Sequence, residues 1–239
     1  MAGSDRHGRS DLTGLGDLSG LEEQRRDIYD RLFEAFGPQH WWPGDGAFEI
    51  IIGAILTQST NWGNVARAIA NLKQAGVLNP QGLAGLDDEH LAGLIRPSGY
   101  YHAKARKVRA FLDLLMAEYS GNLSALLALD LPDLRRVLLA THGIGPETAD
   151  AIILYAAGTP IFVVDAYTRR IFARLDLCPP AGRYDDLQAL FMTNLPHDAT
   201  LFNEYHALLV HLGKHICTKR TPRCRECPLR SVGCLMTGC

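Results

Sequence analysis

Helical periodicity is the feature of this 239-residue sequence that most constrains its fold. Apolar residues recur every three or four positions along most of the chain, and in the segment 21–37 they place Ile28, Leu32 and Phe36 on one helical face. The alternation of apolar and polar residues that marks strands is nearly absent, and the apolar run 161–164 is too short to form a sheet. The sequence therefore predicts an all-α fold.

Short connections rich in Gly, Pro, Asp or Asn separate the predicted helices, as is usual in compact helical proteins. Residues 1–20 lack the helical pattern and are rich in Gly, Ser and Asp, so we expect a flexible N-terminal arm there. The segments with the helical pattern are 21–37, 47–59, 60–76, 90–97, 101–121, 130–143, 146–158, 165–177 and 201–217.

Composition and charge exclude several classes of protein. The formal net charge is −2, so no basic field covers the whole molecule and a nucleic-acid partner would have to bind through local patches. No apolar run approaches the ~18 residues that indicate a membrane-spanning helix, and the N-terminus lacks the apolar core of a secretory signal. We therefore expect a cytoplasmic protein with no membrane partner.

Four of the six cysteines lie within eighteen residues near the C-terminus. Two residues separate the central pair, and six residues separate each member of that pair from its outer neighbour. In a reducing compartment such clustering favours a metal site, with zinc and an iron–sulfur cluster as the tetrahedral thiolate alternatives. A single C-x2-C pair with long arms leans toward the cluster, while surface thiols without a ligand are the simplest alternative. The four residues are Cys217, Cys224, Cys227 and Cys234.

The other two cysteines lie outside this cluster of four. Cys178 stands among apolar and proline residues and is expected to be buried. Cys239 is the last residue and is expected to be free, or to replace Cys234 as a ligand. The segment 211–239 carries six Lys or Arg against one acid, so the loop is either simply solvated or faces phosphate.

The stretch 141–153, THGIGPETADAII, has the pattern of a glycine turn between two helices. Gly143 and Gly145 allow positive φ and leave backbone N–H groups uncovered, and Pro146 suits the first position of a helix. The uncovered amides at that helix N-terminus would bind an anion such as a phosphate. An ordinary glycine turn in a helical hairpin explains the same residues.

Asp165 is a single carboxylate between an apolar run and a helical pattern. It is suited to cap the helix that follows it. A carboxylate beside a buried surface can also stabilise a developing cation and orient a water molecule.

Together these motifs resemble the endonuclease III superfamily of base-excision DNA glycosylases, which have a helix–hairpin–helix, a Gly/Pro-rich loop and an essential aspartate. The matching stretches are FEIIIGAILTQST, GIGPETADAII, VVDAYTRR and the four-cysteine loop, and they span about 41–234. The last cysteine interval departs from the family, with six residues where five are more usual.

The resemblance implies an all-α fold of two helical domains with a helix–hairpin–helix motif and a C-terminal iron–sulfur cluster loop. The first is a six-helix barrel domain over 39–159 that contains the helix–hairpin–helix. The second is an iron–sulfur cluster domain formed by 21–38 and 160–239. A 4Fe–4S cluster on the four clustered cysteines is implied in the same way.

The resemblance also implies roles for three polar side chains. Bifunctional members of the family have a lysine where this chain has Glu147, and a glutamate cannot form a Schiff base with the sugar. A monofunctional glycosylase without lysine-dependent strand cleavage is therefore implied. Asp165 matches the aspartate that supports the oxocarbenium-like sugar and the attacking water, and Gln58 matches the residue that fills the gap left by an extruded base.

One branch of the family is more similar than the others. The stretches WWPGDGAFE, GAILTQSTNW, RPSGYY and GIGPETADAI look like the bacterial type III 3-methyladenine DNA glycosylases. That similarity implies a pocket for the base, whereas the tryptophans taken alone favour core packing. The implied pocket residues are Trp41, Trp42, Pro43, Trp62 and Glu147. The candidate DNA contacts besides Gln58 are Gly143, Gly145, Thr148, Lys104, Arg169 and Arg170.

We therefore expect a monomeric DNA glycosylase that acts in base excision repair on double-stranded DNA with a damaged base, in the cytoplasm at the nucleoid. The expected substrates are alkylated purines such as 3-methyladenine. These bases are cationic, so their glycosidic bond is weak and aromatic faces can select them. The alternatives are a glycosylase for oxidised pyrimidines or mismatches, and a non-catalytic iron–sulfur protein that binds DNA.

Overall fold

The computed structural model describes residues 18–234, and it confirms the predicted all-α fold within that range. No strand occurs there, and none of the described helices is long and apolar enough to cross a membrane. The helices are α1 (Leu18–Phe36), α2 (Ala47–Leu56), α3 (Trp62–Gln74), α4 (Pro80–Ala84), α5 (Asp88–Leu94), α6 (Tyr101–Tyr119), α7 (Leu123–Leu127), α8 (Leu131–Ala140), α9 (Pro146–Tyr155), α10 (Ala166–Arg174), α11 (Tyr184–Met192) and α12 (Ala199–His215). Three short 3₁₀ helices are η1 (Arg96–Ser98), η2 (Cys224–Glu226) and η3 (Arg230–Val232).

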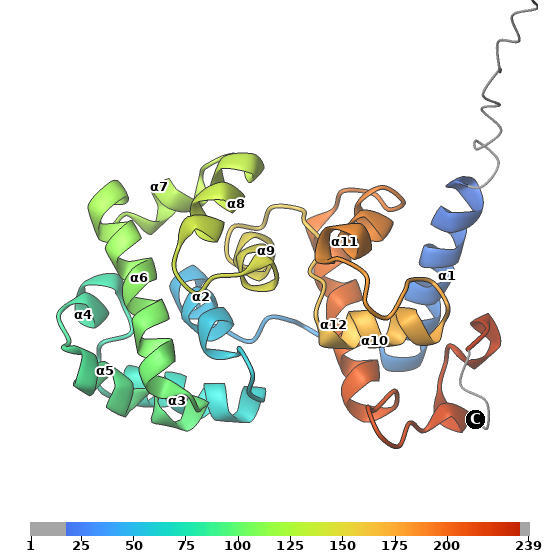
Figure 1. Cartoon of the computed structure of the whole chain (residues 1–239), viewed down its shortest axis with the longest axis horizontal. Helices are drawn as coiled ribbons and strands as arrows, with labels where there is room; N and C mark the ends of the chain where they lie inside the picture. Colours follow the sequence, from blue (N-terminus) through green and yellow to red (C-terminus); the bar gives the residue numbers. More distant parts are fainter. Residues whose placement is uncertain (1–17, 235–239) are drawn as a thin grey trace, which may run out of the picture.

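The helices form two groups that lie side by side (Figure 1). Helices α2–α9 make up one group, in which α2 packs against α3, α6 and α9. Helices α1, α10, α11 and α12 make up the other, in which α1 and α10 both pack on α12. The proposed domains, 39–159 and 21–38 with 160–239, follow the same division and remain a proposal. Most of the predicted arm lies outside the described residues, and positions 18–20 already belong to α1.

Three helices have no counterpart among the predicted segments. Helices α4 and α7 are five residues long, too short to show an apolar period, and each begins at an asparagine cap. The side chain of Asn79 accepts a hydrogen bond from the Gly82 N–H at 2.7 Å, and that of Asn122 accepts from the Ala125 N–H at 3.1 Å. The third, α11, follows a proline- and glycine-containing loop.

A buried carboxylate on α9 joins the two groups of helices. Asp150 on α9 is fully buried and accepts hydrogen bonds from three side chains. Arg135 Nε on α8 lies at 2.8 Å, the Tyr184 hydroxyl on α11 at 2.9 Å and Gln188 Nε2 on α11 at 2.7 Å. A buried charge is tolerated only when it is paired and hydrogen-bonded, so this network fixes α9 to α8 in its own group and to α11 in the other group.

Candidate active site

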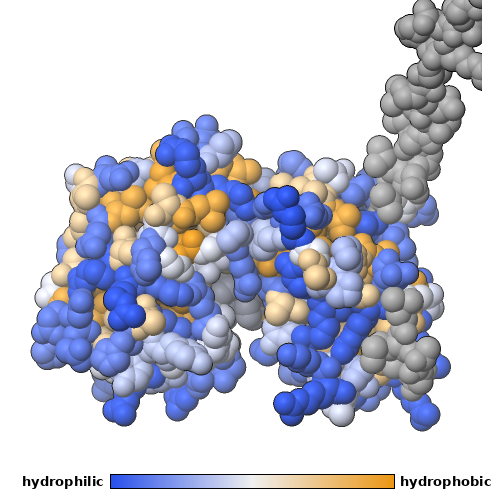
Figure 2. Space-filling view, viewed as in Figure 1, coloured by the Kyte–Doolittle hydropathy of each residue, from blue (hydrophilic) through white to orange (hydrophobic). Residues whose placement is uncertain are grey.

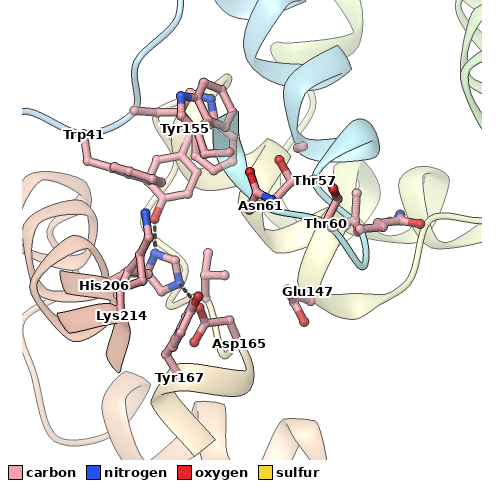
Figure 3. Close-up of a pocket in the computed structure, with 18 residues that line it drawn as sticks. Trp41, Thr57, Thr60, Asn61, Glu147, Tyr155, Asp165, Tyr167, His206 and Lys214 are labelled. Carbon is pink, nitrogen blue, oxygen red and sulfur yellow. Dashed lines mark hydrogen bonds and ion pairs between the residues drawn. The ribbon is translucent and has the colours of Figure 1, made fainter. Parts of the chain in front are cut away.

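A pocket of about 140 Å³ lies where the two groups of helices meet (Figure 3). The surface is also hollowed between the groups, and hydrophilic residues border the hollow (Figure 2). The pocket is similar in size to the roughly 150 Å³ apolar cavity that admits a benzene ring. The residues that line it are Trp41, Trp42, Ala54, Thr57, Gln58, Thr60, Asn61, Trp62, Glu147, Thr148, Ala151, Tyr155, Val163, Asp165, Tyr167, His206, Val210 and Lys214.

Aromatic rings form one wall of the pocket. Trp42 stands edge-on to Trp62, with ring centroids 5.2 Å apart and planes at 86°, and it packs on Tyr155 at 5.1 Å. Trp41 stands edge-on to Trp42 at 5.2 Å. The structure thus brings the three predicted tryptophans together at one cavity. Pro43 is exposed and is absent from the lining residues, so its predicted place in the pocket is wrong.

Asp165 caps α10 and also faces the pocket. Its Oδ1 accepts a hydrogen bond from the Thr168 N–H at 2.7 Å, and its Oδ2 lies 3.6 Å from His206 Nε2. Burial alone would raise the pKa of the Asp165 carboxyl, but His206 and the Thr168 N–H lower it below its ordinary value. The capping role and the pocket position are therefore compatible, and the carboxylate is ionised at neutral pH.

Glu147 lies in the first turn of α9, at the open mouth of the pocket (Figure 3). Burial and the nearby charge of Asp165 raise the pKa of its carboxyl to about 6. The residue as a whole is nevertheless exposed, which fits a carboxylate that water still reaches in the open pocket. Its charge therefore changes close to neutral pH.

The sequence analysis missed several lining residues, chiefly Tyr155, Tyr167, His206 and Lys214. The Tyr155 hydroxyl lies 2.5 Å from His206 Nδ1, so α9 and α12 are joined directly beside Asp165. These residues belong to helices with ordinary apolar patterns and have no local motif. Only the fold, which packs α12 against α9 and α10, reveals them.

The glycine turn between α8 and α9 holds Gln58. Gln58 Nε2 donates to the Gly143 carbonyl at 3.1 Å and the Thr148 hydroxyl at 3.0 Å, and the Lys107 ammonium donates to Gln58 Oε1. Gly143 has φ 80°, and a Cβ there would meet the Lys107 side chain at 2.4 Å. Gly145 has φ −93°, so the expectation that it uses positive φ is wrong.

The basic residues predicted to contact DNA are engaged inside the protein. Lys104 is buried, and its ammonium donates to the carbonyls of Leu56 at 2.8 Å and Ser98 at 2.6 Å. No phosphate can reach it, so the predicted DNA contact of Lys104 is wrong. Arg169 donates to the Gly182 carbonyl. Arg170 donates to the carbonyls of Cys217 at 2.9 Å and Gly213 at 2.8 Å.

The clustered cysteines Cys217, Cys224, Cys227 and Cys234 line a second, smaller pocket of about 40 Å³ with an apolar lining. Arg174 on α10 also lines it, with Nη1 at 3.1 Å from Cys217 Sγ. Within the described range no three His, Cys, Asp or Glu side chains are close enough to hold one metal ion. Cys224 is disulfide-bonded in this structure, whereas Cys217, Cys227 and Cys234 are free thiols. Cys178 is buried, as expected, and Cys239 lies outside the described residues.

Comparisons with known proteins agree with this geometry. Residues 52–197 match the family model described as the HhH-GPD superfamily base excision DNA repair protein. A Methanocaldococcus jannaschii protein with the provisional name DNA repair glycosylase is 41% identical over 205 residues, which cover 85% of this chain and 92% of that protein. Endonuclease III of Sulfolobus acidocaldarius is 29% identical over 184 residues, covering 77% and 79%.

A solved structure is also similar. It is the H. pylori 3-methyladenine DNA glycosylase MagIII bound to 1,N6-ethenoadenine, which superposes with a TM-score of 0.69 at 27% identity. The match covers 82% of this chain and 98% of that one.

Proposed function

The chain belongs to the HhH-GPD superfamily and is a base excision repair DNA glycosylase of the endonuclease III type, and from this premise we propose that it removes alkylated purines such as 3-methyladenine by hydrolysis alone. The observation that carries the proposal is the pocket itself. An ionised carboxylate, Asp165, shares one ring-sized cavity with three tryptophans. The similarity to a 3-methyladenine glycosylase bound to a modified purine supports the same substrate class.

The aromatic wall is suited to an electron-poor base. Stacking of a cation on a tryptophan face contributes roughly 2 kcal/mol when water is excluded. A neutral base gains less from the same wall, so a methylated purine is preferred over its normal counterpart. Extrusion from the duplex is also easier for a lesion that weakens stacking or pairing.

Asp165 carries the chemical step in this proposal. A methylated purine is a good leaving group, so departure of the base needs little acid catalysis. The sugar then develops positive charge, which the fixed carboxylate stabilises. The same carboxylate orients the water molecule that attacks the sugar and accepts its proton.

Glu147 stands where lysine-dependent members of the family place their nucleophile. A carboxylate cannot form an imine with the opened sugar, so strand cleavage by that route is not expected. Its charge at the pocket mouth instead attracts a cationic base. Both statements are proposals, as is a role for Gln58 in filling the gap left by the flipped nucleotide and for Gly143, Gly145 and Thr148 in holding backbone phosphate.

The four clustered cysteines are proposed to hold a 4Fe–4S cluster, which would require Cys224 as a thiolate in place of its disulfide. The supporting observation is their shared apolar pocket, with the Arg174 guanidinium beside Cys217 Sγ. When bound, such a cluster would cross-link the loop that follows α12. Brown colour and visible absorbance of the purified protein would distinguish iron from zinc.

A panel of duplexes, each with one defined lesion, tests the proposal. We expect release of free methylated purine, no release of oxidised pyrimidine, and no adduct with abasic DNA that borohydride can trap. Asp165→Asn should abolish release and preserve binding to a duplex with an abasic-site analogue. Release of oxidised pyrimidines alone would reject the alkylpurine assignment, and a trapped adduct would reject the hydrolytic mechanism.

A further inference from the structure

A line of three buried polar side chains runs from the aromatic wall to Asp165 (Figure 3). Tyr155 Oη lies 2.5 Å from His206 Nδ1, and His206 Nε2 lies 3.6 Å from Asp165 Oδ2. The side chains of His206 and Asp165 are only 6% and 12% exposed. Tyr155 comes from α9, His206 from α12 and Asp165 from the start of α10, so the line crosses between the two groups of helices.

The position of each proton along this line follows from the contacts. Burial and the charge of Asp165 raise the pKa of Tyr155 well above its ordinary value, so its hydroxyl keeps its proton. The Trp41 indole N–H lies near the same oxygen, although its geometry falls short of a hydrogen bond. His206 Nε2 faces the Asp165 carboxylate at 3.6 Å, which favours a hydrogen on Nε2 and leaves Nδ1 to accept the hydroxyl proton of Tyr155.

That donation fixes the tautomer of the imidazole. When Nδ1 accepts a hydrogen bond, a neutral histidine carries its hydrogen on Nε2. His206 Nε2 is buried and has no hydrogen-bond partner in the described part of the chain, and Asp165 Oδ2 lies 3.6 Å from it. A donor held without a partner beside a carboxylate is poised for that carboxylate.

The opposite oxygen of the carboxylate is fixed independently. Asp165 Oδ1 accepts the Thr168 N–H at 2.7 Å, so both oxygens face a donor and the side chain has one preferred orientation. Other titratable groups that share the pocket come from each element packed on it: Glu147 and Tyr155 on α9, Tyr167 on α10, and His206 and Lys214 on α12. Of these, the His206 N–H is the one directed at Oδ2.

We propose that His206 is a positioning residue for Asp165: Tyr155 fixes its Nε2–H, and that N–H holds the carboxylate ionised and aimed at the sugar while a flipped nucleotide fills the pocket. A base in the pocket displaces water, which raises the cost of the carboxylate charge. A donor already in place offsets that cost without reorganisation. His206 therefore acts on the chemical step and leaves DNA affinity unchanged.

Three variants test the inference: His206→Ala, His206→Gln and Tyr155→Phe. Single-turnover base release is measured from about pH 3 to about pH 9 on the lesion that the unmodified protein excises, because the pKa of Asp165 lies below its ordinary value and its acid limb must fall within the range. His206→Ala should slow release by about tenfold or more, and the acid limb of its profile should move up by about one pH unit because the pKa of Asp165 rises. Its affinity for a duplex with a tetrahydrofuran abasic analogue should not change.

The conservative variant separates positioning from packing. The amide N–H of His206→Gln can replace Nε2–H, so this variant should release base within about threefold of the unmodified rate with an unshifted profile. Tyr155→Phe leaves the imidazole in place and frees its tautomer, so an intermediate rate is expected. An unshifted profile and rate in His206→Ala would overturn the inference. If that variant does not fold, an equal loss in the Gln and Phe variants would overturn it.

A second measurement needs no substrate. Nitrogen NMR of the free protein should show His206 as the Nε2–H tautomer, and Tyr155→Phe should shift the ring toward a mixture. A Nδ1–H tautomer in the unmodified protein would overturn the inference. Because the kinetic test rests on the proposed glycosylase function, a protein that releases no base rejects that function, while the NMR result still decides the role of His206.

Discussion

Glu147 is a side chain whose charge should set the selectivity of the pocket. Its pKa is raised from 4.5 to about 6, so it is neutral at pH 5 and charged at pH 8. The ratio of the release rate of cationic methylated purines to that of neutral lesions should therefore increase as pH rises through about 6. In Glu147→Gln, which resembles the protonated form, this ratio should be independent of pH. A ratio with the same pH dependence in both proteins would exclude Glu147 as the selector.

The same shift has a consequence for stability. A carboxyl whose pKa is raised on folding contributes stability below its ordinary value of 4.5, and that contribution is lost as pH rises through about 6. Glu147→Gln should therefore raise the thermal midpoint at pH 8 and leave it nearly unchanged at pH 5. Differential scanning calorimetry at the two pH values measures this. A gain of equal size at both would show that the shift does not affect folding.

Sequence motifs identified the side chains of the site that have local context. Asp165 precedes a helical pattern that marks it as a helix cap, whereas only the family resemblance, and not their own pattern, put Trp41, Trp42 and Trp62 in one pocket. His206 and Tyr155 lie inside apolar helices, where the same residue types usually only pack. The predicted DNA contact of Lys104 failed because a basic segment on a helix is usually solvated, whereas the Lys104 ammonium caps the carbonyl end of α2.

At the scale of elements, α12 must approach α10 closely for Tyr167 to line the pocket. Gly213 on α12 is buried, and a Cβ there would meet Tyr167 Cδ1 at 2.4 Å and Tyr167 Cβ at 2.8 Å. Gly213→Ala should therefore displace Tyr167, reduce the free energy of unfolding by about 1–3 kcal/mol and slow base release. Gly93→Ala on α5, where a Cβ meets no atom within 4 Å, is the control and should do neither. Equal effects of Gly213→Ala and Gly93→Ala would show that the contact between α12 and α10 can accommodate a methyl group at position 213.

The Asp150 network holds α9 between α8 and α11, and its loss should be costly. Asp150→Ala leaves Arg135, Tyr184 and Gln188 without their shared acceptor, so we expect the free energy of unfolding to fall by about 3–5 kcal/mol. Urea denaturation measures it. Arg136→Ala is the control. Arg136 lies on α8 beside Arg135, and its replacement removes the exposed pair with Asp133, so it should have no measurable effect on the free energy of unfolding. A loss of less than about 1 kcal/mol for Asp150→Ala would mean that water replaces the carboxylate.

Elements that depend on long-range packing were the hardest to predict. Long amphipathic helices such as α1, α6 and α12 follow their apolar period closely, because burial of one face decides their formation. The five-residue helices α4 and α7 are stabilised by asparagine caps and by packing on α6, which sequence periodicity does not report. The packing of α12 against α1, α9 and α10 likewise depends on contacts between residues far apart in the sequence.

At the scale of the whole molecule, each group of helices supplies half of the site. Trp62, Gln58 and Glu147 come from the α2–α9 group, whereas Asp165 and His206 come from the group around α12. Neither group holds a complete site, so activity requires that their relative placement be preserved. The Asp150 network and the Tyr155–His206 contact both cross between them.

The loop that carries the four clustered cysteines contacts the C-terminal end of α10, and it should help to preserve the relative placement of the two groups of helices. Arg170 and Arg174 bind the Cys217 carbonyl, the Cys217 sulfur and the Thr218 carbonyl, so the loop holds the end of the helix that begins after Asp165. If the loop holds the proposed 4Fe–4S cluster, Cys227→Ala should lose iron and visible absorbance, and its thermal midpoint should fall by roughly 5 °C or more, or about 2 kcal/mol at this chain length. Base release should then fall further than DNA binding. Cys178→Ala, a buried cysteine outside the loop, should keep its iron and colour. Full iron content in Cys227→Ala would show that this cysteine is not a ligand.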